Sequence, residues 1–204
     1  MNDTRQRILD TALLLFSQRG FSAVSIRDIC AEVHIKESSV YYHFKNKRAI
    51  FDELLLLFEQ RAERMMRQLE HAVGGQPEAN GDMLYRRTCE VFFEDYLMDG
   101  FCNSVLRLLL IEQHGSAEAG HVLDRWMFEV PLSFQSGVFS ALISRGLLRD
   151  CDSGYLAVRF YAPIYMFAQR WLFTGALTQE RKRAFRDAAY RHVEAFFMEV
   201  GAIK

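Results

Sequence analysis

A run of hydrogen-bond donors stands near the N-terminus, in the segment from Lys36 to Lys47 (KESSVYYHFKNK). Small hydroxyl groups at the start of a helix can reach base edges in a DNA major groove, and donors around them can bind phosphates. The first turn of a helix also attracts phosphate through its free N–H groups. The spacing therefore favours a nucleic-acid interface built from Ser38, Ser39, Tyr41, Tyr42, His43 and Lys47.

Three short helices are expected to position that segment. Apolar residues at helical spacing predict a first helix that ends at Gly20, and a second helix that begins after Ser25. Ser25 can cap the second helix, while Asp28 favours its positive end. A third helix is expected from Glu37 to His43. Two helices joined by a tight turn form a helix-turn-helix, whose second helix enters the major groove.

Helical periodicity continues along the rest of the chain. Asn46 can cap a long fourth helix that runs to about His71, and a linker rich in Gly and Pro follows at 74–81. Pro131 is expected to kink or split the third of the later helices. The later helices are predicted near 82–98, 102–114, 117–145, 152–174 and 178–200. The fold class is therefore all-α with about nine helices, an N-terminal three-helix domain followed by a helical bundle.

The charge is unevenly distributed. Residues 1–48 carry eight Lys or Arg against five Asp or Glu, a net charge of +3, and the remainder carries −4. A basic head on an acidic body suggests a polyanionic partner for the head. The four cysteines form no CxxC pair and are expected to be reduced thiols of a cytoplasmic protein. No signal peptide and no membrane span is expected.

The first fifty residues resemble the DNA-binding signature of TetR-family transcriptional regulators. The resemblance implies a transcription repressor with a helix-turn-helix domain at 1–46, a connecting helix at 47–71 and a ligand-binding and dimerisation domain at 72–204. Residues after the signature resemble the family only in length and number of helices. The matching positions are Thr4-Arg5, Ile8-Leu9, Ala12, Leu15-Phe16, Gly20-Phe21, Ile26-Arg27-Asp28-Ile29 and Val40 to Lys47.

The resemblance also implies roles for single residues. Ser25 and Arg27 fall where the family's second helix touches phosphate or a base edge. Glu37, Ser38 and Ser39 fall at the start of the recognition helix, where bases are read. The positions that usually bind phosphates hold Tyr41, Tyr42, His43 and Lys47.

Two positions depart from the family pattern. The turn between the two helices usually holds glycine, and here it holds His34, so a positive φ is expected on a non-glycine residue. The recognition helix often has Ser or Thr as its cap. Lys36 stands there, which gives up a side-chain cap worth about 1 kcal/mol but adds a cation beside the phosphates. Alternative roles stay open for Tyr41, as a packing residue, and for Glu37, as a partner of the helix dipole.

Residues 82–173 are rich in large apolar and aromatic side chains. One interpretation is a plain core and dimer interface. The other is an apolar cavity with a few polar groups that orient a small-molecule effector, and the resemblance favours this one. The residues predicted to line the cavity are Phe93, Tyr96, Arg107, Trp126, Phe134, Gln135, Arg159, Tyr161 and Tyr165.

A homodimer is expected, because a two-fold symmetric protein reads a palindromic operator in double-stranded DNA. The last two helices are predicted to form a four-helix bundle across the axis. The face of the last helix predicted to lie at the axis consists of Phe185, Ala188, Ala189, His192, Ala195, Phe196 and Glu199.

An enzyme is not expected, because no GxSxG, HExxH, P-loop or GxGxxG motif occurs. A di-iron site in a helical bundle needs two Glu-x-x-His motifs and two further glutamates. The chain has one such match, from Glu118 to His121, so neither a metal nor another cofactor is expected. A second alternative keeps the DNA-binding head but gives the later domain a protein partner, as in an activator or an architectural factor.

Overall fold

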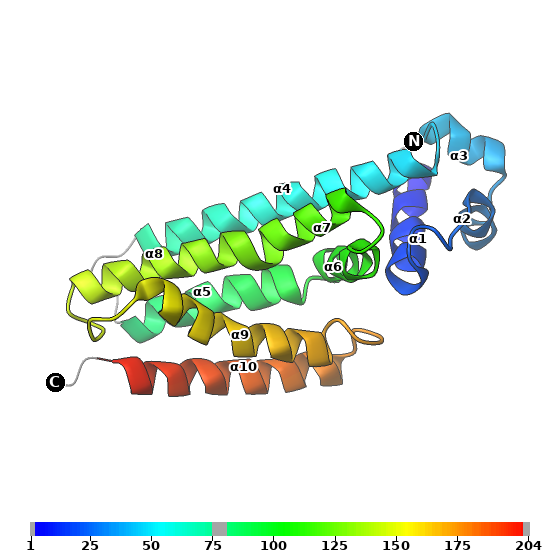
Figure 1. Cartoon of the computed structure of the whole chain (residues 1–204). Coiled ribbons are helices and arrows are strands. Elements are labelled where there is room, and N and C mark those ends of the chain that lie inside the picture. Colours follow the sequence, from blue (N-terminus) through cyan, green and yellow to red (C-terminus); the bar gives the residue numbers. More distant parts are fainter. Residues whose placement is uncertain (1–2, 75–80, 202–204) are drawn as a thin grey trace. The chain divides into compact units, whose positions relative to one another are not determined.

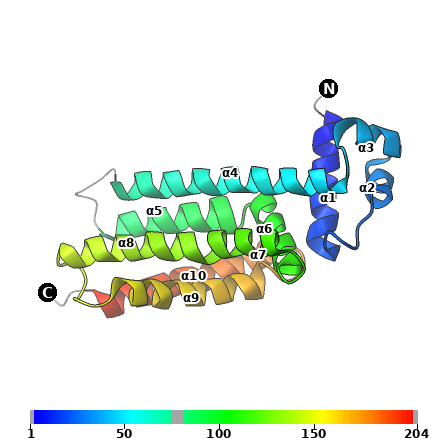
Figure 2. The ribbon, with the colours of Figure 1, turned by 45° about the horizontal axis from the view of Figure 1, so that its top comes forward.

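The computed structural model describes residues 3–74 and 81–201, and within those residues the chain is helical (Figures 1 and 2). Nine continuous helical stretches run through the described ranges, because two of the stretches contain a π-helical turn. The predicted all-α class with about nine helices is confirmed. Within these ranges, no helix has the length and apolar character needed to cross a membrane.

The first of two compact units combines Met1–Arg67 with Asp99–Leu123. Besides the predicted helix-turn-helix it therefore contains two later helices, which the sequence did not lead us to expect. The predicted domain limits at residues 46 and 71 stay a prediction. The helices of this unit are α1 (Asp3–Arg19), α2 (Ile26–Val33), α3 (Glu37–His43), the first part of α4 (Lys47–Gly74), α6 (Gly100–Glu112) and most of α7 (Ala117–Asp124).

α1 forms the centre of this unit. Its buried side chains recur at helical spacing, which gives the helix one apolar stripe that packs against α2, α3 and α6. Ile8, Ala12 and Phe16 on this stripe are fully buried. The stripe fixes the helix-turn-helix on a rigid support.

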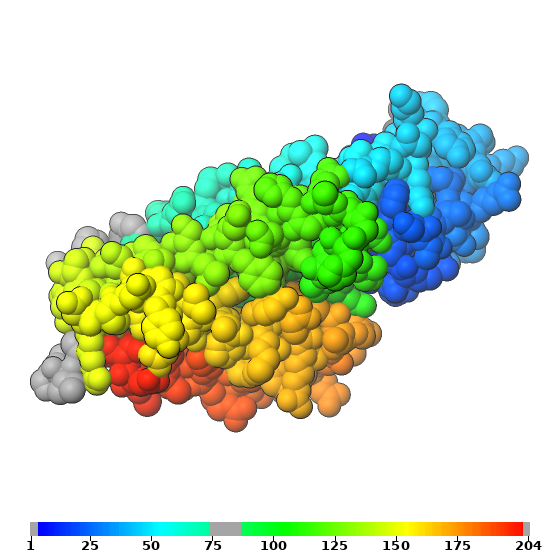
Figure 3. Space-filling view, viewed as in Figure 1, coloured from blue at the N-terminus to red at the C-terminus, as the bar shows by residue number. Residues whose placement is uncertain are grey.

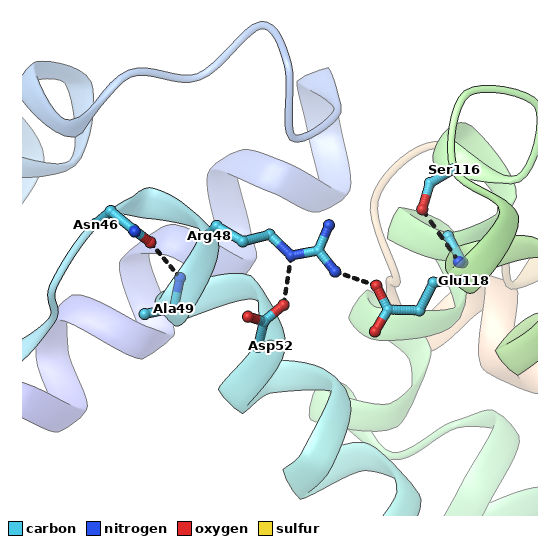
Figure 4. Close-up of polar contacts among 7 residues, drawn as sticks. Asn46, Arg48, Ala49, Asp52, Ser116 and Glu118 are labelled. Carbon is cyan, nitrogen blue, oxygen red and sulfur yellow. Dashed lines mark hydrogen bonds and ion pairs between the residues drawn. The ribbon is translucent and has the colours of Figure 1, made fainter.

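Side-chain caps stand at the start of several helices, and those at Ser25 and Asn46 were predicted. Ser25 caps α2, and Asn46 Oδ1 accepts the Ala49 N–H at 2.9 Å at the start of α4 (Figure 4). Thr178 caps α10 (Gln179–Val200) by accepting the Arg181 N–H. Each cap satisfies a backbone donor that the first turn leaves without a partner.

The second unit combines Gln68–Met98 with Asp124–Lys204. α9 (Ser153–Trp171) packs against both α8 (Val130–Ser144) and α10, and the space-filling view shows α9 and α10 side by side along one surface (Figure 3). The core of this unit holds the rings of Phe139, Phe160 and Phe196, whose centroids lie 5.2–5.8 Å apart. The remaining elements of this unit are α5 (Gly81–Phe92), η1 (Phe93–Leu97) and η2 (Arg125–Glu129).

Pro131 acts through a π-helical turn. Proline has no N–H. A helix that contains proline therefore lacks the backbone hydrogen bond from that residue to a carbonyl in the preceding turn. The helix was expected to kink or split there, and its α-helical pattern is interrupted: α7 passes through the π turn η2 into α8, with Pro131 in the first turn of α8. In η2 the Val130 N–H bonds to Arg125 O.

The cysteines are free thiols, as expected. Cys30, Cys89 and Cys102 are buried, and Cys151 is exposed. Burial raises the pKa of the Cys89 and Cys102 thiols to about 12, so both stay protonated and act as small apolar side chains.

Candidate DNA interface and effector site

α3 presents two large aromatic side chains to solvent. The side chain of Tyr42 is 80% exposed and that of Tyr41 is 52% exposed, while Val40 and Phe44 anchor the helix in the core. Tyr41 therefore does not pack beneath the helix, which removes the alternative considered for it. Two exposed tyrosines on one seven-residue helix indicate a surface kept for a partner.

The turn that presents α3 has the expected strain. His34 adopts φ +59°, in the left-handed region, and its N–H bonds to Cys30 O at the end of α2. Lys36 is the N-cap of α3 and makes no side-chain cap. Both departures from the family pattern are therefore confirmed as conformational features of this turn.

Arg27 and Glu37 meet across the two helices of the motif. Arg27 Nε donates to Glu37 Oε1 at 3.0 Å, and both side chains are exposed. Each was predicted to contact DNA, and each stays a candidate. Glu37 places a negative charge on the surface predicted to bind phosphates, and Arg27 pairs with that charge in the free protein.

Ser25 belongs to a complete capping box. Its Oγ accepts the Asp28 N–H at 3.2 Å and donates to Asp28 Oδ2 at 2.6 Å, while its own N–H donates to the same carboxylate at 2.7 Å. These bonds lower the pKa of Asp28 below its usual value. The cap is confirmed, and contact between Ser25 and DNA stays a prediction.

Lys47 binds backbone carbonyls. Its Nζ donates to Phe21 O at 2.7 Å and Val24 O at 2.6 Å, and lies 4.2 Å from the centre of the Phe21 ring. Glu112 accepts the Phe21 N–H at 2.9 Å, so the turn between α1 and α2 is held from both sides. Glu112 stands 91 residues from Phe21, and no sequence motif indicates the contact. The phosphate contact of Lys47 stays a prediction.

Arg48 joins α4 to α7 inside the first unit. Its guanidinium pairs with Asp52 and with Glu118, and Ser116 caps α7 by accepting the Ala119 N–H (Figure 4). Glu118 was the acid of the single Glu-x-x-His match, and it is used here in an ion pair. The described residues bring together no group of three metal-ligating side chains.

The predicted DNA-binding side chains share one structural property, which is that none of them is buried. Those that are half-buried are Ser39, His43 and Lys47. Those that are exposed are Ser25, Arg27, Lys36, Glu37, Ser38, Tyr41 and Tyr42.

The predicted effector residues do not all share a unit. Arg107 lies on α6 in the first unit, and the other eight lie in the second. Of these eight, Phe134, Arg159 and Tyr165 are half-buried. Those that are buried are Phe93, Tyr96, Trp126, Gln135 and Tyr161.

The buried tyrosines flank one ring. The centroid of Phe92 lies 5.6 Å from Tyr96 and 6.0 Å from Tyr161. The Tyr96 hydroxyl donates to Trp126 O at 3.1 Å, and so links the two π turns η1 and η2. The Tyr161 hydroxyl is buried and has no hydrogen-bond partner among the described residues, and burial raises its pKa. Phe92 was missing from the predicted lining, although its position one residue before Phe93 was a usable signal.

Two of the three half-buried members already have hydrogen-bond partners. Arg159 donates to Glu199 at 2.6 Å, and Tyr165 accepts from Gln169 Nε2 at 2.6 Å. Phe93 packs edge-on against Phe185 and also contacts Tyr190, so it is part of the aromatic core.

The face of α10 expected at a dimer axis is largely an internal one. Phe185, Ala188, Ala189 and Phe196 are buried within the single chain, because they pack under α10 rather than pointing away from it. The prediction is therefore wrong for these four residues, and for His192, Ala195 and Glu199 it stays a prediction. The large apolar side chains that α9 and α10 expose are Tyr155, Val158, Met166 and Met198.

The helix-turn-helix packs on the buried apolar stripe of α1, and a second helical unit follows it. This architecture is typical of all-helical DNA-binding regulators. Residues 8–54 match the family model described as bacterial regulatory proteins, tetR family. Over these residues the chain is similar to the TetR family of bacterial regulatory proteins. The relatives that it matches are transcriptional regulators rather than enzymes.

Individual relatives match over different lengths. The HTH-type transcriptional regulator AcrR of Shigella flexneri is 36% identical over 75 residues, which is 37% of this chain and 35% of AcrR. The matched segments cover between 26% and 35% of the curated relatives. The chain thus matches these relatives over about a quarter to a third of their length.

Solved structures match the fold along the chain. The ketosteroid transcriptional regulator KstR2 of Mycobacterium tuberculosis is 20% identical with a TM-score of 0.70, and the match covers 100% of this chain and 97% of KstR2. SmeT of Stenotrophomonas maltophilia in complex with triclosan is 19% identical with a TM-score of 0.65, covering 95% of this chain and 91% of SmeT. At these identities the likeness shows the fold alone.

Proposed function

We propose that this protein is a transcriptional repressor that binds a palindromic operator as a homodimer and is released by a small, largely apolar effector. The observation that carries the DNA-binding part is the surface of α3, where Tyr41 and Tyr42 are exposed on a helix anchored by Val40 and Phe44. A helix held this way can enter a major groove without rearranging its own core.

The homodimer is supported by the surface of the last two helices. Tyr155, Val158 and Met166 are exposed at helical spacing on α9, and Met198 on α10 is 85% exposed. Val158 follows Tyr155 by three residues, and Met166 follows Tyr155 by eleven residues, which is about three helical turns. The three side chains from α9 therefore share a helix face that a second copy can cover. Burial of such apolar surface is the main favourable contribution to subunit association.

The effector is supported by relatives and by the aromatic cluster in the second unit. SmeT, the repressor of a multidrug efflux pump, has been solved with triclosan, and KstR2 is named a ketosteroid regulator. In this chain the cluster around Phe92 contains two buried tyrosines. A mainly apolar site with few polar groups suits a small apolar effector.

Two structural links are proposed to carry the effect of a bound effector to the helix-turn-helix. α4 begins in the first unit and ends in the second, and Glu112 at the end of α6 holds the turn before α2. An effector releases the operator only through its different affinities for the two conformations. A hundredfold loss of operator affinity corresponds to about 2.7 kcal/mol of coupling. By reciprocity, operator DNA must weaken effector binding by the same factor.

The test begins with selection of duplexes from a random pool, followed by titration at several salt concentrations. Palindromic sites with half-sites about one helical turn apart are expected. Lys36→Ala should flatten the salt slope by about 1 per subunit, because one phosphate contact is lost. Ser38→Ala should keep the slope and change the preferred sequence. Failure to select any duplex, or equal losses on all duplexes for Ser38→Ala, would contradict DNA reading by α3.

A further inference from the structure

We propose that the Tyr161 hydroxyl recognises the effector, and that it selects a flat, mainly apolar and uncharged molecule with one hydrogen-bond acceptor, such as a ketone oxygen. The inference rests on the proposed function, because it assigns the polar group of the effector site assumed there. It goes further by naming one atom of the protein and one chemical group of the ligand.

The first argument is the state of the hydroxyl itself. The Tyr161 side chain is 6% exposed, and its oxygen is buried with no partner among the described residues. Buried polar groups in folded proteins are hydrogen-bonded in the great majority of cases, because losing water without a replacement is costly. A buried phenol without a partner is therefore a position where a ligand atom restores the missing bond.

The second argument is the contrast with the neighbouring phenol. Tyr96 and Tyr161 both lie against Phe92, but the Tyr96 hydroxyl donates to Trp126 O. That carbonyl lies five residues before Pro131, which has no N–H to offer in a π turn. Tyr96 thus already has a structural partner in the Trp126 carbonyl. Of the two phenols beside Phe92, Tyr161 is the one left for a ligand.

The third argument concerns the chemistry of the ligand. Burial keeps the Tyr161 phenol protonated at neutral pH, so it presents an O–H donor, and a carbonyl or ether oxygen is the complementary group. Aromatic neighbours such as Phe92 and Tyr96 favour a flat apolar body. Arg159 and Arg186 of the same unit already pair with Glu199 and Glu94, so a carboxylate ligand finds no cation free among these.

The experiment compares two probes of similar shape by equilibrium dialysis. 2-Acetylnaphthalene carries one carbonyl acceptor, and 2-isopropylnaphthalene replaces it with a methyl group. Tyr161→Phe should weaken binding of the ketone about tenfold, as expected for one buried hydrogen bond, and leave the hydrocarbon unchanged or tighter. Tyr190→Phe, which removes the hydroxyl of a half-buried tyrosine of the same unit that is not in the predicted lining, is the matched control and should change neither.

A second measurement needs no ligand. Tyr161→Phe should raise the urea midpoint of the free protein, because it removes a buried hydroxyl that lacks a partner. A lower midpoint would show that the hydroxyl is used in the structure and would overturn the proposal. Equal loss of both probes in Tyr161→Phe, or binding of neither probe to the wild type, would also overturn it.

Operator binding separates this inference from the proposed function. One outcome is that the ketone binds through Tyr161 but does not change the affinity of the protein for selected duplexes. The role of Tyr161 in recognition is then supported, and release of the operator by an effector is contradicted. If another apolar compound releases the operator equally from the wild type and from Tyr161→Phe, the repressor stands and the role of Tyr161 is overturned.

Discussion

Four tyrosines in two regions of the molecule show how differently one side chain can be used. On α3, Tyr41 and Tyr42 expose their rings and hydroxyls to water. Beside Phe92, Tyr96 and Tyr161 are buried. A solvated phenol loses little when it exchanges water for a phosphate, so α3 suits a large, wet and charged partner. A buried phenol has already lost its water. A buried phenol without a partner therefore strongly favours a ligand that supplies a hydrogen-bond acceptor.

The polar contacts of the molecule fall into two ranges, and both regions contain long-range ones, such as the bond from the Phe21 N–H to Glu112 in the first unit. In the head, the capping box of α2 joins residues three apart, and the cap of α4 does the same. In the second unit the Tyr96 bond spans 30 residues, and the ion pair between Glu94 and Arg186 spans 92. Local contacts fix single helices, whereas long-range contacts fix how helices pack.

The largest effect is expected from Phe93→Ala, which tests whether Phe93 belongs to the core or to an effector cavity. The side chain is 1% exposed and packs on Phe185 and Tyr190. Its removal should lower the free energy of unfolding by about 3–5 kcal/mol, because a cavity replaces a filled core position. Urea unfolding followed by circular dichroism measures the loss. Leu147→Ala, at an exposed position of the same unit, is the control. A loss below about 1 kcal/mol would instead favour a cavity lining.

Loss of the hydrogen bond from Tyr96 to Trp126 O should lower the free energy of unfolding by a smaller amount, and the amount should depend on Pro131. Tyr96→Phe leaves Trp126 O without the donor that the hydroxyl supplies, and should cost about 1–3 kcal/mol. In a Pro131→Ala background the backbone regains an N–H, so the same change should cost less. The double-mutant cycle gives the coupling directly. Equal costs in both backgrounds would show that Pro131 does not create the need for Tyr96.

The range of the contacts explains what the sequence could and could not predict. The cap by Ser25, the positive φ of His34 and the uncapped Lys36 were predicted, because each depends on a few neighbouring residues. The tie from Glu112 to Phe21 and the pairing of Arg159 with Glu199 were not predicted, because helical spacing does not tell which helices meet. For the same reason Phe185 and Phe196 were assigned to a dimer face, although the α10 stripe faces the core of its own subunit.

The capping box of α2 tests how much a contact between neighbouring residues contributes to stability. Ser25→Ala should lower the free energy of unfolding by about 1 kcal/mol at neutral pH. The Ser25 bonds lower the pKa of Asp28 in the folded state, so their contribution is present above the ordinary aspartate pKa and is lost as pH falls through the lowered value. Urea midpoints of variant and wild type should therefore converge in acid. A difference that stays constant between pH 7 and pH 3 would show that the carboxylate does not take part.

The smallest effect on stability, and the most informative one on DNA binding, is expected from Glu37→Gln. The pair with Arg27 is exposed on both sides, so its loss should cost less than about 1 kcal/mol. The change removes a negative charge from the α3 surface and frees Arg27 for a phosphate. Affinity for random duplexes should rise, and the salt slope should steepen by up to about 1 per subunit.

Glu63→Gln on α4 is the matched control, because it removes an exposed carboxylate that pairs with Arg67. It should leave the slope unchanged if the effect of Glu37 comes from its place on α3. The opposite outcome for Glu37→Gln is equally informative. An unchanged slope with weaker binding to selected duplexes alone would mean that the carboxylate accepts a hydrogen bond from a cytosine amino group. Glu37 would then read a base, and Arg27 would orient it for that contact rather than neutralise it.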